Sequence, residues 1–252
     1  MTEQEYEKAL ARVRKNGMEL QYIREKTPEL ILEAIADNAW ALQFVTDQTE
    51  EQCLAAVRKN GMALSVAKVR TEAVCEAAVT QNGRALRTIR PKTPRLCRLA
   101  VESSPAALKY VDEQTEELCR VAVEKDGDAI QYVKNQTEEL SMLAVMRKPS
   151  SIRYVKHKTP QLEALAQIAE DPIRILTIEN PTKEMQLFAV RCDWSVFELL
   201  YDPDEEVCIE AVSQNGNLLA YVQNQTLAIC RAAVAQDKTA VRFVKKWFLD
   251  EL

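Results

Sequence analysis

Few residues of this chain are of the types that carry out catalysis or bind metals. His157 is the single histidine, so a histidine metal site or a Ser-His-Asp triad has nothing to build on. None of the seven cysteines forms a CxxC pair, and a Cys-His nucleophile would have to bring one of them beside His157. No GxGxxG or GxxxxGK pattern is present to bind phosphates. We therefore expect a protein that is not an enzyme and that has no cofactor.

Six of the cysteines recur at one fixed position of a repeating pattern: Cys53, Cys75, Cys97, Cys119, Cys208 and Cys230. Equivalent residues of stacked helical repeats lie roughly 9–10 Å apart. A disulfide requires Cα atoms within about 7 Å, so we predict buried, reduced core side chains, with Cys192 outside the series. Free thiols and an opening stretch, Met1 to Glu5, without the features of a signal peptide indicate a cytoplasmic protein.

The repeating pattern has a period of 22 residues. Its opening residue is Thr27, Thr49, Thr71, Thr93, Thr115, Thr137 and Thr159, and after one inserted residue Thr182, Asp204 and Thr226. A fixed period of this length is typical of a solenoid, in which each repeat packs on its neighbours. We predict an all-α solenoid of about eleven two-helix repeats, forming one continuous array over residues 1–252. Repeats are regular in 5–158 and 204–252, and residues 159–203 form an irregular bend.

One repeat, residues 115–136, shows how the pattern builds two helices. Thr115 is a good N-cap, and Glu116 and Glu117 suit the positive end of a helix. Apolar residues then fall at i, i+1, i+4 and i+5 from Leu118, which predicts one buried helical face. A second helix of about two turns follows, either α or 3₁₀. Because isolated helices this short are marginal in water, stacking must supply the stability.

All five glycines (Gly17, Gly61, Gly83, Gly127 and Gly216) fall at position thirteen of their repeats, where the first helix should end. A glycine there favours a left-handed cap. Pro105 and Pro149 occupy this position in two repeats and Trp194 in another. At the chain ends, Thr2 and Glu5 predict a capping box. Trp247, Phe248 and Leu249 predict a C-terminal cap over the last open face.

The recurring string A-V-x-x-N-G-x-A-L resembles a known family of tandem repeats. It occurs from Ala56 to Leu64 and from Ala78 to Leu86, and a related string runs from Ala211 to Val222. This is similar to the short helical-hairpin repeats of a bacterial and protist domain of unknown function. The resemblance covers nearly the whole chain, weakens between Thr159 and Pro203, and implies a HEAT-like α-solenoid. It implies no catalytic residues.

Basic residues recur on the second helix and in the loop after it. They are Arg24, Lys68, Arg87, Arg90, Lys109, Lys134, Arg153 and Lys156. One explanation is the helix dipole, which favours the glutamates at the start of the first helices and these basic residues at the end of the second helices. Alternatively, the row forms a basic ridge that binds an acidic protein segment or a nucleic-acid backbone. The net charge of −5 argues against a protein built only to neutralise phosphates.

Aromatic residues recur at position eighteen, among them Tyr22, Tyr110, Tyr132 and Tyr221. Such residues act as base-stacking platforms in some proteins. Because Val66 and Leu199 stand at the same position, we favour partly buried wedges.

Position fourteen carries Met18, Trp40 and Met62 in three consecutive repeats, where later repeats have polar residues such as Arg84. We predict an exposed apolar patch that docks a protein; the alternative is packing against the N-terminal segment. No apolar run approaches the roughly 18 residues needed to cross a bilayer. We expect a scaffold that binds a protein partner and no membrane; the alternative is nucleic-acid binding along the basic ridge.

Overall fold

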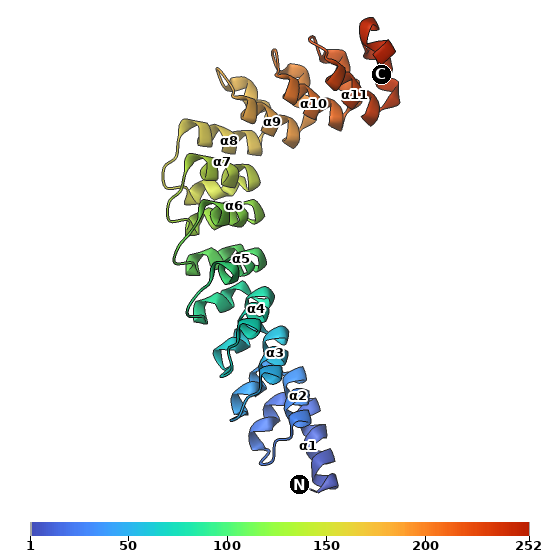
Figure 1. The fold of residues 1–252 in the computed structure, drawn as a ribbon. Helices are drawn as coiled ribbons and strands as arrows, with labels where there is room; N and C mark the ends of the chain where they lie inside the picture. The colour runs from blue at the N-terminus through green and yellow to red at the C-terminus, as the bar shows by residue number, and fades with distance from the viewer. Residues whose placement is uncertain (1, 252) are drawn as a thin grey trace. The chain divides into compact units, whose positions relative to one another are not determined.

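A computed structural model describes residues 2–251, so residues 1 and 252 of the predicted array lie outside it. These residues form α- and 3₁₀ helices and no strand. They belong to two compact units, Met1–Gln136 and Thr137–Leu252. In each unit, an α-helix followed by a 3₁₀ helix recurs about every 22 residues (Figure 1). The predicted all-α solenoid is confirmed, and the second helix of each repeat is 3₁₀; the continuity of the array across the two units stays a prediction.

The first unit contains six helix pairs: α1 (Glu3–Lys15), η1 (Gly17–Tyr22), α2 (Pro28–Asp37), η2 (Ala39–Phe44), α3 (Glu50–Lys59), η3 (Gly61–Ser65), α4 (Glu72–Gln81), η4 (Gly83–Thr88), α5 (Pro94–Ser103), η5 (Pro105–Tyr110), α6 (Glu116–Lys125) and η6 (Gly127–Tyr132). Each α-helix contacts the next α-helix, and each 3₁₀ helix contacts the next 3₁₀ helix. The unit therefore has two parallel rows of helices with the core between them.

The second unit also alternates α- and 3₁₀ helices and ends with an additional 3₁₀ helix: α7 (Glu138–Arg147), η7 (Pro149–Tyr154), α8 (Pro160–Glu170), η8 (Pro172–Thr177), α9 (Lys183–Cys192), η9 (Trp194–Leu199), α10 (Glu205–Gln214), η10 (Gly216–Tyr221), α11 (Leu227–Gln236), η11 (Lys238–Phe243) and η12 (Lys246–Glu251). In the irregular region, α8 is 11 residues long where α9 has 10. Since α8 still contacts both α7 and α9, this region is packed and is not a linker. No helix within residues 2–251 has the length and apolar character needed to cross a membrane.

The opening threonines begin the α-helices as predicted. Thr93, for example, accepts a hydrogen bond at its Oγ1 from the backbone N–H of Leu96 at 3.2 Å. Thr2 and Glu5 form the expected capping box. Asp204 is the exception, because its side chain makes no cap hydrogen bond.

Replacing Thr93 by alanine is expected to lower the free energy of unfolding by about 1 kcal/mol, because the backbone N–H of Leu96 at the start of α5 then depends on water. Urea titration followed by circular dichroism measures this. Thr46→Ala is the control, since Thr46 is exposed and caps no helix. Equal stabilities of the two variants would show that the Thr93 cap contributes nothing.

The core consists of columns of equivalent residues. The predicted column members are buried, including Leu30, Leu96, Leu140, Leu42, Leu64, Leu86, Leu108, Ile130, Val57, Val79, Val101, Val123 and Val212. The six cysteines of the series are buried as well, and all seven cysteines are free. Leu118 departs from its column, because it is only half-buried.

The predicted left-handed glycine caps are wrong. No glycine among residues 2–251 has a positive φ. Each is the first residue of a 3₁₀ helix, and Gly83, for example, starts η4. A Cβ at Gly83 would lie 2.1 Å from the carbonyl oxygen of Ala100 in α5. A Cβ at Gly17, Gly61 or Gly216 would lie 2.1–2.5 Å from a carbonyl oxygen of the next repeat. Glycine is therefore needed because the following α-helix approaches this backbone too closely for any side chain.

Position twenty-two, the last residue of each repeat, links neighbouring repeats in a way that the sequence analysis did not identify. Gln48 is 8% exposed. Its Nε2 donates to the carbonyl of Leu42 in its own repeat at 3.0 Å and to that of Val66 in the next at 3.1 Å. Its Oε1 accepts the backbone N–H of Lys68 at 2.7 Å. Gln114 and Gln225 make the same contacts.

The predicted C-terminal cap is only partly formed. The helix η12 contacts α11, and Arg231 of α11 donates to the carbonyl of Glu251 at 2.9 Å. Phe248 is half-buried, but Trp247 and Leu249 are 66% and 44% exposed. These two side chains therefore do not cover the core.

Candidate functional site

The end of each 3₁₀ helix, the loop after it and the first turn of the next α-helix form one edge of each unit, which we call the loop edge. The predicted basic ridge lies on it. Six of its residues belong to the first unit (Arg24, Lys68, Arg87, Arg90, Lys109 and Lys134), and Arg153 and Lys156 belong to the second. The structure therefore brings the first six residues onto one described edge and does not place the other two beside them.

Some of these cations also hold the repeats together. The Nζ of Lys68 donates to the carbonyl of Thr46 at 2.9 Å, and that of Lys134 donates to the carbonyl of Asp112 at 2.5 Å. In each case the acceptor lies 22 residues earlier, at the equivalent position of the preceding repeat. These lysines therefore satisfy exposed carbonyls while their ammonium groups stay at the surface.

Lys109 lies against two aromatic rings of the position-eighteen column. Its Nζ is 4.8 Å from the ring centre of Tyr110 and 5.7 Å from that of Tyr132 in the next repeat. Both tyrosines are half-buried, which agrees with the wedge interpretation, whereas Tyr22 and Tyr221 are 65% and 53% exposed and do not. The contact fixes a cation between two repeats.

The loop segment 87–95 is the most basic part of the loop edge. It contains Arg87, Arg90, Lys92 and Arg95 and no acidic residue. The segment 109–117 of the next repeat carries Asp112, Glu113, Glu116 and Glu117 against one cation. Two oppositely charged segments therefore face one another between α5 and α6.

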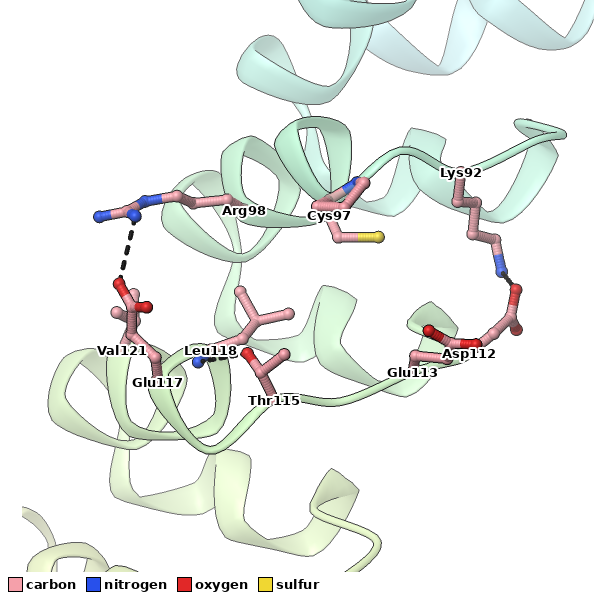
Figure 2. A pocket seen from close by; sticks show the side chains of 10 residues that line it. Lys92, Cys97, Arg98, Asp112, Glu113, Thr115, Glu117, Leu118 and Val121 are labelled. Carbon is pink, nitrogen blue, oxygen red and sulfur yellow. Dashed lines mark hydrogen bonds and ion pairs between the residues drawn. The ribbon is translucent and has the colours of Figure 1, made fainter.

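A cleft of about 530 Å³ opens between these two segments (Figure 2). Its apolar lining comes from Pro94 and Cys97 on α5 and from Leu118 and Val121 on α6. Figure 2 shows one ion pair at each end of the cleft, with Cys97 and Leu118 between them. The cleft is therefore apolar in the middle and polar at both ends.

The two ion pairs differ in burial. Lys92 donates to the Asp112 carboxylate at 2.9 Å and also to the carbonyl of Tyr110; its side chain is only 5% exposed, while that of Asp112 is 72% exposed. The hydrogen bond from Lys92 holds the pKa of Asp112 below its usual value. At the other end, Arg98 pairs with Glu117 at 3.2 Å, and both side chains are exposed.

One hydrogen bond that joins neighbouring repeats elsewhere in the chain is not available at the cleft. Thr71 donates its hydroxyl hydrogen to Glu50 of the preceding repeat at 2.5 Å, and Thr226 donates in the same way to Glu205. At Thr115 the equivalent residue of the preceding repeat is Pro94, which has no acceptor to offer. In addition, α5 and α6 are more loosely packed than α3 and α4, and Leu118 is half-buried.

The proposed patch of Met18, Trp40 and Met62 is half-buried and not fully exposed. The backbone N–H of each residue is held by the Asn side chain two positions before it, at 3.0–3.1 Å. The three residues occupy the same position in η1, η2 and η3, which contact one another in order. The three residues therefore lie on successive 3₁₀ helices, with less free apolar surface than the sequence suggested.

The cysteines and the single histidine have different surroundings. Burial raises the pKa of the Cys97 thiol, although this thiol borders the cleft. Burial also raises the pKa of Cys192. Since a thiolate is the nucleophile, these cysteines are weakly reactive. His157 is exposed, and the described chain has no cluster of three or more His, Cys, Asp or Glu side chains placed to hold a metal ion.

Comparison of the chain with family models, with curated proteins and with solved structures finds no match.

Proposed function

We propose that this protein is a non-enzymatic helical-repeat scaffold that binds a protein partner. The observation that carries the proposal is the loop edge of the first unit, where exposed cations recur from repeat to repeat and a partly apolar cleft opens between α5 and α6. Repeat arrays offer extended surfaces of this kind for binding. The patch of Met18, Trp40 and Met62 is a second candidate contact in the same unit. Membership of the helical-hairpin repeat family and a cytoplasmic location form part of the proposal.

A peptide-display selection tests this function. A library of random 16-residue peptides is panned on the immobilised full chain, with the urea-unfolded chain as the control surface. We expect enriched peptides that bind the folded chain with Kd of about 10 μM or tighter, equivalent to about 7 kcal/mol. No enrichment over the unfolded control would contradict a peptide-binding scaffold.

Nucleic-acid binding along the basic ridge is the alternative, and the packing of Lys109 against Tyr110 and Tyr132 favours it, because cations beside aromatic rings also bind single strands. A gel shift with a 20-nucleotide oligothymidylate, titrated with salt, tests it. Phosphate binding weakens steeply with salt. Replacing Arg87, Arg90 and Lys134 together by glutamine would then abolish the shift. Binding that ignores both changes would remove this alternative.

A further inference from the structure

A second cleft lies on the loop edge of the second unit and has a volume of about 460 Å³. Its lining comes from the N-terminal parts of α7 and α9, with Gln161 of α8. The apolar part of the lining is formed by Met142 of α7, which is half-buried, and Met185 of α9, which is 2% exposed. A cleft of this size accommodates one long side chain together with part of its backbone.

Every charged residue that lines this second cleft is acidic. Glu138 and Glu139 lie in the first turn of α7 and Glu184 lies in that of α9, and all three side chains are exposed. None of the three forms an ion pair with a cation in the part of the chain that the structure describes. Lys183, the neighbour of Glu184 in the sequence, pairs instead with Glu206 of α10 at 2.7 Å. The lining is therefore complementary to positive charge.

The combination of carboxylates and methionines specifies what kind of cation fits. These glutamates do not form a metal site, because residues 2–251 contain no cluster of three or more His, Cys, Asp or Glu side chains placed to hold a metal ion. A side chain with a long aliphatic stem and a charged end suits both parts of the lining. Its methylene groups pack on the methionines, which adapt to the shape of what they contact, and its charged end stays beside the carboxylates at the surface. Arginine and lysine have this form.

We propose that the cleft between the N-terminal parts of α7 and α9 receives one arginine or lysine side chain of a basic linear segment in a partner protein. The stem of this side chain lies on Met142 and Met185, and its charged end pairs with the glutamates of the lining. The inference rests on the proposed scaffold function and specifies a partner by its chemistry. Ion pairs with the exposed glutamates give orientation and association rate, and burial of the stem adds affinity.

Three fluorescein-labelled peptides of eleven residues test the proposal by fluorescence polarisation with the full chain. The first has Arg at the centre and alternating Lys and Ser on each side. In the second, 2-amino-3-guanidinopropionic acid replaces the central Arg, which keeps the charge and removes two methylene groups; the third has Glu in place of each Lys. We expect binding of the first, about tenfold weaker binding of the second, and none of the third. Equal affinities for the first two peptides would show that charge alone is recognised and would overturn the proposal.

Two variants locate the binding site. Glu139→Gln with Glu184→Gln changes only exposed side chains of the lining and is expected to weaken binding of the first peptide about tenfold. Met142→Lys places a cation of the chain itself in the cleft and is expected to weaken binding at least as much. The control is Glu124→Gln with Glu170→Gln, which makes the same change of net charge at exposed residues in the last turns of α6 and α8 and should leave the affinity unchanged. If Met142→Lys fails to fold, the glutamine variants decide.

The outcomes separate this inference from the function on which it rests. If neither Met142→Lys nor the two replacements of glutamate in the lining change the affinity of the first peptide, the cleft assignment is overturned, and a successful display selection still supports the scaffold function. Spermidine that binds more tightly than the first peptide, and loses binding in the Glu139→Gln, Glu184→Gln variant, would overturn the assignment in favour of a small polyamine. A failed display selection would remove the scaffold function itself.

Discussion

Replacing Gly83 by valine is expected to lower the free energy of unfolding by about 3 kcal/mol or more, at the upper end of the cost of overpacking. A Cβ at Gly83 would lie 2.1 Å from the carbonyl oxygen of Ala100 and 3.0 Å from its carbon. These are backbone atoms of α5, so they cannot turn away as a flexible side chain would. Either the interface between the fourth and fifth repeats opens or the backbone distorts.

Asparagine at the same position separates this explanation from the left-handed cap suggested by the sequence. Asparagine tolerates a left-handed conformation, so a cap would accept Gly83→Asn at small cost. If instead the backbone of α5 lies too close to Gly83 for any Cβ, Gly83→Asn should destabilise the chain about as much as Gly83→Ala. Urea titrations of the three variants measure this.

The control for these variants is Lys238→Val. Lys238 occupies the same position in the last repeat and is exposed. Its replacement should change the stability by no more than about 0.5 kcal/mol, as for other surface substitutions. A loss as large as that of Gly83→Val would show that valine is unfavourable at the start of any of these 3₁₀ helices, whatever packs on it.

The fold was predictable because it depends on local signals repeated many times. Thr93 and its equivalents cap helices through their own first turn, and the buried leucines and valines follow helical spacing. The role of Gly83 was not predictable in this way. Its neighbour Ala100 belongs to the next repeat, and the distance between the two backbones depends on stacking geometry that the period alone does not specify.

The candidate site was predictable only in part. The cations of segment 87–95 are visible in the sequence, and Arg87 and Arg90 were assigned to the basic ridge on that basis. The cleft depends on the looser packing of α6 on α5, and the period of the repeat does not specify that packing. Lys92 was missed because its position resembles that of a solvated loop residue, whereas its side chain is almost fully buried beside Asp112. Lys92 stands at position twenty-two of its repeat. Polar residues recur at this position, and that recurrence is a sequence signal by which such residues can be found.

Replacing Gln48 by alanine is the second large effect that we expect, with a loss of about 2–4 kcal/mol in the free energy of unfolding. The side chain is buried and hydrogen bonds to both repeats that it joins. Alanine leaves the carbonyls of Leu42 and Val66 and the N–H of Lys68 without this partner. Buried polar groups that lose their partners pay the full cost of desolvation, which exceeds the value of the bonds themselves.

The Gln48→Lys variant tests whether the donor group or the acceptor oxygen of the Gln48 amide contributes to stability. Lys92, at the equivalent position of its repeat, donates to the carbonyl of Tyr110 in the next repeat, so Gln48→Lys should keep the donor half of the contacts and lose the acceptor half. Its stability should therefore lie between those of the alanine variant and the natural chain. Gln43→Ala is the control, because Gln43 is an exposed residue of η2. If Gln48→Ala is no more costly than Gln43→Ala in urea titration, hydrogen bonding at position twenty-two does not join the repeats, and the packed leucine and valine columns must hold the stack alone.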